Sequence, residues 1–286
     1  MNKNIGIIGN GFVGSAIAAG FSLHANVRIH DQNKKLTVNS FEETINESEF
    51  VFICVPTPMD LETRRIDISI ITDVLEHASR IINRKDTIFI IKSTVIPGTI
   101  ENFIKRFLNL RIVFSPEFLT ERSAKLDFIN TSRIILGGSS DDVERSQVLF
   151  RDRFPHTPIL KTDVTTAQFI KYMNNSFFAT KVSFMNEMKQ CADAVGVNWK
   201  DTVCGFMLDG RIGNSHIEVP GHDGDCGFGG KCFPKDINAF INYFDDNGID
   251  AKVMKAAWNK NIEVRHYHNW LEIPGAVSFN TSKKLE

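Results

Sequence analysis

The stretch Gly9-Asn10-Gly11-Phe12-Val13-Gly14 decides the fold, and it follows an apolar run that begins at Ile5. Its spacing is G-x-G-x-x-G, placed between a predicted strand and a predicted helix, which is the arrangement that cradles a dinucleotide pyrophosphate. Gly9 allows the tight turn, Gly11 lets the phosphates approach, and Gly14 permits close helix packing. We therefore predict that these glycines, with Phe12 and Val13, bind a dinucleotide. A turn with incidental glycines is the alternative.

An acidic residue at the end of the second predicted strand bears on the choice of cofactor. Asp31 lies 17 residues after Gly14. A carboxylate at this place accepts hydrogen bonds from the adenosine ribose and repels a 2′-phosphate, so NAD is favoured over NADP. Because the cationic Lys34 and Lys35 follow closely, the preference for NAD over NADP is left open at this point.

The first half of the chain alternates short apolar runs with helical patterns. The predicted strands are dense in Ile, Val and Phe, as strands covered on both faces are. They span residues 5–9, 26–31, 50–56, 87–94, 111–115 and 133–138. Helices are predicted between them, for example over 14–24 and 67–83. The alternation predicts an α/β fold with a Rossmann-like, doubly wound parallel sheet.

The second half is predicted to be helical. Helical patterns cover 163–195, 199–207, 235–245 and 251–270, and a Gly-rich loop spans 210–230. We predict an NAD-binding domain at 1–155 and an all-helical domain at 156–280 that carries this loop. Residues 281–286 resemble a cloning remnant and are left out of the fold prediction.

Composition bounds the class of protein. The 286 residues carry a formal net charge of −1, with 42% hydrophobic and 23% charged residues. These values are ordinary for globular proteins and give no indication of nucleic-acid or anionic-membrane binding. No apolar run reaches the roughly 18 residues of a membrane-spanning helix. The N-terminus predicts a strand and a turn rather than a signal peptide. Five scattered cysteines argue against a disulfide framework and favour a reducing cytoplasm.

Three polar motifs fall where predicted strands end. The segment 55–58 contains Thr57, the segment 92–98 contains Thr94, and the segment 115–121 contains Glu117 and Glu121. Ligands of open α/β sheets lie beyond the carboxyl ends of the strands, so the two hydroxyls would line the nicotinamide side. A helical turn would put both glutamates on one face, one as a general base and the other beside cofactor or water. The competing interpretations are that the Pro and Thr residues only form turns, and that the two glutamates only mark an exposed helix start.

One cysteine is placed as a nucleophile would be. Cys232 follows two glycines, and Lys235 and Asp236 come three and four residues later. Glycines let backbone amides approach a substrate, and a nearby lysine favours the thiolate that attacks carbonyls. We predict that Cys232 is catalytic and captures an aldehyde, so that an alcohol is oxidised through a thioester to a carboxylate. A buried, inert cysteine is the alternative.

Two further groups of polar residues have the composition of reactive sites. Lys171 and Asn175 lie four apart on the long predicted helix, where a cation and an amide can hold an oxyanion, although many helices carry such a pair by chance. The Gly-rich loop holds six residues of metal-ligating type, but none has the spacing of a known metal motif, and we predict no metal site. These six are His216, Glu218, His222, Asp223, Asp225 and Cys226.

Taken together, the motifs resemble the UDP-glucose/GDP-mannose dehydrogenase family, and they occur in family order over nearly the whole chain. The matching segments are GNGFVG, CVPTP, KSTVIPGT, SPEFLTE, the helix with Lys171 and Asn175, the DGRIG segment at 209–213, and GFGGKCFPKD. Each segment is short, but jointly they are highly specific. The resemblance implies NAD as cofactor, a nucleotide sugar as substrate, and a homodimer built on the long helix.

The resemblance also implies a role for individual residues. Cys232 would form the thiohemiacetal and the thioester, and Glu117 would be the base for thioester hydrolysis with Thr94 in the water relay. Oxyanions and water would be held by Lys171, Asn175 and Asp236. Glu121 would lie at the nicotinamide end. The sugar nucleotide would contact Phe118, Leu119, Lys171, Asn175, Phe228, Gly229 and, from the neighbouring subunit, Arg211.

Two departures from the family pattern are visible. The segment between Asp31 and Phe50 is shorter than usual, and the family's third domain, which completes the nucleotide pocket, is not present in this sequence. Uridine recognition is therefore left open. UDP-glucose is the favoured substrate and GDP-mannose the near rival. The second hypothesis is a two-domain β-hydroxyacid dehydrogenase with a single hydride transfer, and the third is an inactive nucleotide-binding module.

Overall fold

The computed structural model describes residues 3–279, so the predicted tail at 281–286 lies outside the described residues. The chain divides into two compact units. The first comprises residues 3–57 and 67–171, and the second comprises residues 58–66 and 172–279. Among the described residues no helix is both long and apolar enough to cross a membrane.

The first unit is built on a seven-stranded sheet, in the order β2-β1-β3-β5-β6-β7-β8. Neighbouring strands are parallel except for β6 and β7, which are antiparallel. The strands are β1 (Lys3–Ile8), β2 (Ala25–His30), β3 (Phe50–Ile53), β5 (Ile88–Ile91), β6 (Arg111–Phe114), β7 (Ile134–Gly137) and β8 (Ile159–Thr162). The predicted Rossmann-type fold class is confirmed, although β8 was not among the predicted strands.

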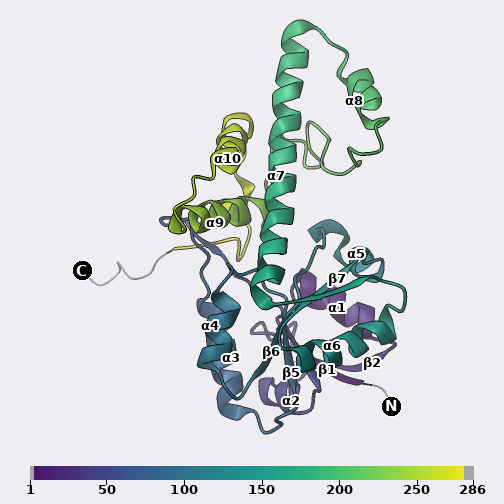
Figure 1. The fold of residues 1–286 in the computed structure, drawn as a ribbon, viewed down its shortest axis with the longest axis vertical. Helices are drawn as coiled ribbons and strands as arrows, with labels where there is room; N and C mark the ends of the chain where they lie inside the picture. The colour runs from purple at the N-terminus through teal and green to yellow at the C-terminus, as the bar shows by residue number, and fades with distance from the viewer. Residues whose placement is uncertain (1–2, 280–286) are drawn as a thin grey trace, which may run out of the picture. The chain divides into compact units, whose positions relative to one another are not determined.

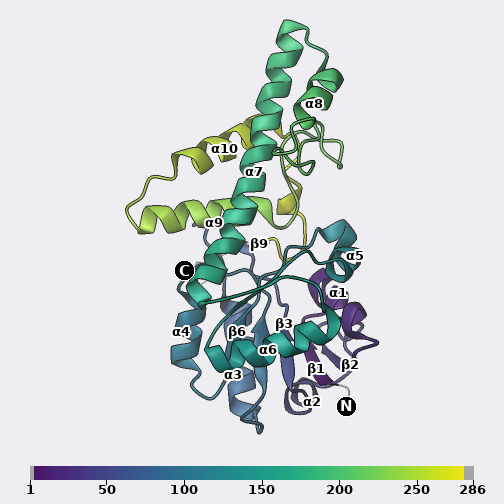
Figure 2. The same cartoon turned by 45° about the vertical axis from the view of Figure 1, so that its right-hand side comes forward.

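Helices cover both faces of this sheet (Figure 1 and Figure 2). One face packs against α2 (Phe41–Asn46), α3 (Ser69–Ile81), α4 (Thr99–Arg106) and the start of α7 (Val164–Val195). The other packs against α1 (Phe12–Phe21), α5 (Ala124–Ile129) and α6 (Ser140–Arg153). Successive strand residues alternate between the two cores: Phe89 and Ile91 belong to the first, and Ile88 and Ile90 to the second. This two-sided burial explains the continuous apolar runs of the sequence.

The second unit is mainly helical. It contains α7 from Tyr172 onward, α8 (Trp199–Met207), α9 (Phe233–Asp246), α10 (Lys252–Val264) and a short 3₁₀ turn, η2 (Asn269–Leu271). Its core includes Trp258 and Trp270. The prediction of an all-helical unit omitted a two-stranded parallel sheet of β4 (Met59–Asp60) and β9 (Val277–Ser278).

The predicted helix over 251–270 is too long. The chain leaves α10 at Arg265, whose backbone is extended, with φ −89° and ψ 123°. The Arg265 side chain turns inward and donates to Asp223 and to two backbone carbonyls. A buried guanidinium needs several acceptors, and this demand overrides the local helical pattern.

The tight packing at the Gly-rich turn generates a paired prediction. A Cβ built on Gly14 would lie 2.0 Å from the Gly9 carbonyl oxygen, whereas one on Gly11 would meet nothing within 4 Å. We expect Gly14→Ala to lower the free energy of unfolding by about 1–3 kcal/mol, as overpacking does. Gly11→Ala should leave the thermal midpoint within a degree or two but weaken NAD binding at least tenfold. Differential scanning fluorimetry and calorimetric NAD titration measure the two effects, and equal destabilisation by both changes would contradict this account.

Candidate functional site

The Gly-rich turn and Asp31 are joined directly. Gly9 adopts a φ of +91°, and its N–H donates to the His30 carbonyl at 2.9 Å. The Asp31 carboxylate accepts the Asn10 N–H at 2.7 Å and the Asn33 N–H at 2.7 Å. Two bonds leave lone pairs on the carboxylate for ribose hydroxyls. The open face at Gly11, the free first-turn amides that a helix presents, and Asp31 together fit NAD.

The motifs after β3 and β5 meet at the carboxyl edge of the sheet. The Thr57 hydroxyl donates to the Thr94 carbonyl oxygen at 2.8 Å, and the Ser93 hydroxyl donates to the Val55 carbonyl oxygen at 2.7 Å. All four residues are buried or nearly so. The structure therefore brings the two predicted threonines together, with the Thr57 O–H engaged in holding the two strand ends to each other.

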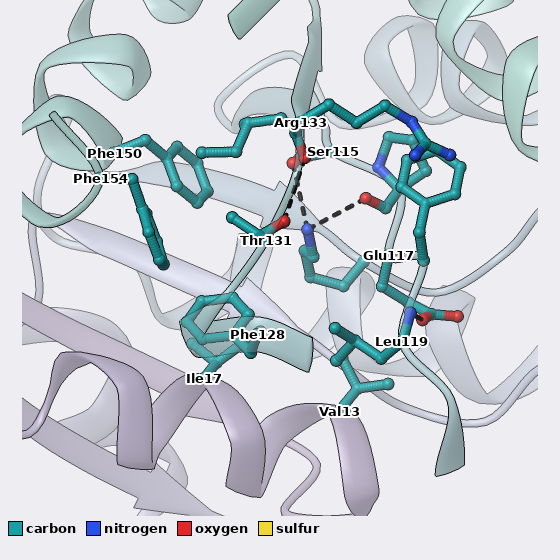
Figure 3. A pocket seen from close by; sticks show the side chains of 14 residues that line it. Val13, Ile17, Ser115, Glu117, Leu119, Phe128, Thr131, Arg133, Phe150 and Phe154 are labelled. Carbon is teal, nitrogen blue, oxygen red and sulfur yellow. Dashed lines mark hydrogen bonds between the residues drawn. The ribbon is translucent and has the colours of Figure 1, made fainter. Parts of the chain in front are cut away.

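Glu117 and Lys171 form a buried ion pair in the first unit. The Lys171 ammonium lies 3.1 Å from Glu117 Oε1 and donates to the Glu117 carbonyl oxygen at 2.6 Å. Glu117 Oε2 accepts the Leu119 N–H at 2.7 Å. The side chains are only 7% and 3% exposed, so water screens the pair little. Glu117, Ser115 and Leu119 are among the side chains that line the small pocket of Figure 3.

No helical turn links Glu117 to Glu121 in the structure, so the two glutamates do not share a helix face. Glu117 lies in an irregular segment, and Glu121 is exposed at the start of the 3₁₀ turn η1 (Glu121–Ser123). Because the Glu117 carboxylate captures the amide of Leu119, two residues on, the local backbone bonds of a helix do not form. Glu121 instead lines a separate pocket of about 270 Å³ with Phe12 and Ser15 of α1.

Phe118 is held by cations on two sides. Its ring centroid lies 4.0 Å from the Arg133 guanidinium carbon and 5.4 Å from the Lys171 nitrogen. Such cation–π contacts contribute about 0.5–1 kcal/mol each at partly exposed sites. They fix the segment that carries Glu117, Phe118 and Leu119, and Arg133 was not among the predicted site residues.

In the second unit, Asp236 is almost fully buried and is shared by two donors. Asn175 of α7 donates to Asp236 Oδ2 at 2.6 Å, and Lys235 forms a salt bridge with Oδ1. The lysine expected to favour a thiolate on Cys232 is thus paired with Asp236. Burial, with the nearby Asp236 charge, raises the pKa of Tyr172 well above its ordinary value. Lys171 and Asn175 lie one turn apart on α7.

Cys232 caps the N-terminus of α9 and is partly exposed rather than sealed in the core. Pro234 in the first turn suits a helix start, because its missing N–H would have no partner there. The positive end of a helix dipole favours negative charge. This end of α9 would therefore stabilise negative charge.

The glycine loop before Cys232 is held by asparagine side chains that were not among the predicted site residues. Asn186 accepts the Gly227 N–H and Asn269 accepts the Gly230 N–H, both at 3.0 Å. Asn261 bonds both the N–H and the carbonyl of Phe228. A Cβ on Gly227 would lie 2.3 Å from Asn261 Oδ1, so the loop needs glycine there. The sequence signal from which these loop contacts could have been predicted is the occurrence of asparagine at core-facing positions of α7 and α10.

The acidic residues of the same loop serve structure. Asp223 pairs with the buried Arg265 at 2.6 Å, and Asp225 accepts from the Tyr267 N–H at 3.0 Å and lies 3.0 Å from a His266 ring nitrogen. Within residues 3–279, no three His, Cys, Asp or Glu side chains come together as a metal site would require. Arg211 points into solvent, with its side chain 89% exposed and paired with Asp209.

Comparisons with known proteins match both units. The description "UDP-glucose/GDP-mannose dehydrogenase family, NAD binding domain" fits residues 22–152, and the central domain of the same family fits residues 165–263. The chain belongs to the UDP-glucose/GDP-mannose dehydrogenase family. The predicted family and the NAD cofactor are thereby confirmed.

Individual members of the family and of the wider fold are also similar. UDP-glucose 6-dehydrogenase of Rickettsia prowazekii is 33% identical over 90% of this chain and 66% of its own length. The structure of a UDP-glucose dehydrogenase from Pyrobaculum islandicum superposes with a TM-score of 0.81 at 27% identity, over 92% of this chain and 68% of that one. Mycobacterium tuberculosis 3-hydroxyisobutyrate dehydrogenase shares the fold, with a TM-score of 0.73 at 17% identity, over 92% and 94%. This chain thus spans about two thirds of the length of its UDP-glucose dehydrogenase relatives.

The asparagine contacts around the glycine loop generate a second prediction. Asn261→Ala would leave the buried N–H and carbonyl of Phe228 without their partner, at about 1–3 kcal/mol for each group. We expect a lower thermal midpoint and a severalfold faster alkylation of Cys232 by iodoacetamide, followed by mass spectrometry. Asn247→Ala is the matched control, because Asn247 is exposed and its side-chain amide donates to the Tyr243 carbonyl four residues earlier. An unchanged alkylation rate in Asn261→Ala would show that Asn261 does not hold the loop.

Proposed function

We propose that this chain carries out the NAD-dependent, four-electron oxidation of a nucleotide sugar, with UDP-glucose converted to UDP-glucuronate. The observation that carries the proposal is the placement of Cys232, partly exposed at the N-terminus of α9, one turn before Asp236, which Asn175 bonds, and after a loop held by asparagines. Relatives bearing the name UDP-glucose 6-dehydrogenase support the choice of substrate. GDP-mannose is the alternative nucleotide sugar.

The chemistry requires a thiol between two hydride transfers. NAD, held by the Gly-rich turn and Asp31, would supply the hydride acceptor for both oxidations, one molecule for the primary alcohol and a second molecule for the thiol adduct. The Cys232 sulfur adds to the aldehyde carbon, so that a C–S bond forms and the carbonyl oxygen takes a proton. Loss of the second hydride and of that proton leaves a thioester. Water then attacks, the C–S bond breaks, and carboxylate and free thiol are released.

The remaining site residues would serve charge and proton transfer. Lys171 and Asn175, one turn apart on α7, would stabilise the negative charge that develops on the oxygen of the reacting carbon. Glu117 would activate the hydrolytic water with Thr94 in the relay, and Asp236 would orient Asn175 and hold water. Phe118, Leu119 and the Phe228–Gly229 segment would contact the sugar nucleotide. The buried Lys171–Glu117 pair supports this assignment of roles, because Lys171 is paired with the proposed base Glu117 and could also bond an oxyanion of the substrate.

A single-hydride dehydrogenase acting on a β-hydroxyacid is the second candidate, and the shared fold with 3-hydroxyisobutyrate dehydrogenase favours it. Such an enzyme would use the dinucleotide site and Lys171 but would have no need of Cys232. An inactive nucleotide-binding module would bind NAD without turnover.

Replacement of the thiol separates these candidates. The wild-type protein should form two NADH per UDP-glucose, whereas Cys232→Ser should form no more than one and lose steady-state carboxylate production by at least a hundredfold. Cys204→Ser is the control, because Cys204 is exposed on α8. NADH absorbance and carboxylate analysis by mass spectrometry give the stoichiometry. Two NADH per sugar from Cys232→Ser would refute the thioester route, and no NADH from UDP-glucose, GDP-mannose or UDP-N-acetylhexosamines would refute the proposed function.

We also propose that the chain forms a homodimer through α7. Large apolar side chains recur along this helix and are exposed, which favours a partner surface over solvent; they are Met173 (56%), Phe177 (62%), Phe184 (50%) and Met188 (36%). The exposed Arg211 would then reach the sugar in the neighbouring subunit.

Charge placed on this stripe should break the dimer. Phe177→Glu should shift the protein to monomer in analytical ultracentrifugation, because a carboxylate would be buried without a partner. Leu108→Glu, at a position that is 87% exposed in the first unit, should leave the mass unchanged. A wild-type protein that sediments as a monomer at micromolar concentration would contradict the proposal.

A further inference from the structure

A second buried lysine lies behind Glu117. Lys92 follows β5 and is only 7% exposed. Its ammonium donates to the Ser115 hydroxyl at 3.1 Å and to the Pro116 carbonyl oxygen at 3.3 Å, and it lies 6.0 Å from the centre of the Phe150 ring. The small pocket of Figure 3 is lined by this lysine together with Ser115, Glu117 and Arg133. Neither the proposed reaction nor the fold prediction gives Lys92 a role.

The charges around Lys92 are few and identifiable. Burial lowers the pKa of Lys92 from 10.5 to about 8; the neighbouring Glu117 opposes this shift, and Lys171 adds to it. Burial likewise raises the pKa of the Cys54 thiol to about 12, so that Cys54 is neutral in the physiological range. Near neutral pH, two buried ammonium groups therefore face one buried carboxylate, and Arg133 lies at the same pocket.

A buried ammonium is costly, and an apolar side chain of similar length would avoid that cost. Two hydrogen bonds and one aromatic face offset it only in part. The two hydrogen bonds of the Lys92 ammonium go to the two residues that immediately precede Glu117. The position of the lysine thus bears on Glu117 more than on any other site residue.

We propose that Lys92 is a positioning residue for Glu117: it clamps the 115–116 segment and supplies a second positive charge behind the carboxylate. This inference rests on the proposed function, in which Lys171 must serve both Glu117 and the oxyanions of the substrate. When the Lys171 ammonium moves toward an oxyanion, its ion pair with Glu117 weakens, and the Glu117 carboxylate is held less firmly. Lys92, whose ammonium is bonded to the 115–116 segment, keeps the base in place through that step.

The kinetic test compares Lys92→Met with Lys92→Arg. Lys92→Met should lower kcat for nucleotide-sugar oxidation at least tenfold, with the NAD dissociation constant within twofold of the wild-type value. Lys92→Arg should recover part of the loss, because arginine keeps its charge at all accessible pH values. Since Lys92 loses its proton as the pH rises through about 8, the ratio of kcat for Lys92→Arg to kcat for wild type should increase between pH 7 and pH 9.5.

A purely structural lysine gives a different pattern. In that case Lys92→Met would lower the thermal midpoint while kcat of the folded fraction and the kcat ratio stayed constant with pH, and the proposal would be overturned. Should Lys92→Met fail to fold, Lys92→Arg and Ser115→Ala carry the same test, because Ser115→Ala removes one clamp bond and leaves the charge.

A spectroscopic readout separates this proposal from the proposed function. In protein labelled with ¹³C at the lysine ε-carbon, the signal absent from Lys92→Arg should titrate near pH 8 in the wild type. A midpoint above pH 10 would show that Lys92 is not buried as described and would overturn the inference. If no nucleotide sugar yields NADH, the proposed function fails, whereas the titration still reports on the placement of Lys92.

Discussion

The buried ion pair between Glu117 and Lys171 is the constraint on which the candidate site of the first unit depends. It joins the carboxyl end of β6 to the start of α7 across 54 residues of sequence. A buried pair is strongly destabilised when one partner is removed, because the remaining charge has no solvation. The same pair therefore fixes the irregular segment after β6 against the start of α7.

The second unit must hold a glycine-rich loop in one conformation. Glycine gives up more backbone freedom on ordering than any other residue. Asparagine side chains offset this by bonding the loop amides, and Arg265 closes the loop through Asp223 and the Cys226 carbonyl. Cys232 can then be partly exposed and still be fixed in place. Rigid support of a reactive group by buried neighbours is the general requirement for precise chemistry.

Local sequence pattern was sufficient for the strands of the parallel sheet and for the Gly-rich turn. Phe89 and Ile91 alternate with Ile88 and Ile90 between two cores, and the resulting apolar run has no simpler explanation. The pattern failed where side chains override it. The helix ends at Arg265 because the guanidinium turns inward, and no helical turn links Glu117 to Glu121 because Glu117 bonds the Leu119 amide. Neither event has a signature in hydrophobic periodicity.

The sequence by itself determined the family, the dinucleotide fold, NAD as cofactor and the identity of the candidate nucleophile, since each depends on residues that are close together in the chain. Only the tertiary structure decided which charges meet. Lys235 pairs with Asp236, Asn261 binds a loop 33 residues away, and Lys92 lies beneath Ser115. Such contacts depend on how distant elements pack, and burial strengthens the electrostatic energy of each contact. The spacing of residues along the sequence does not reveal that burial.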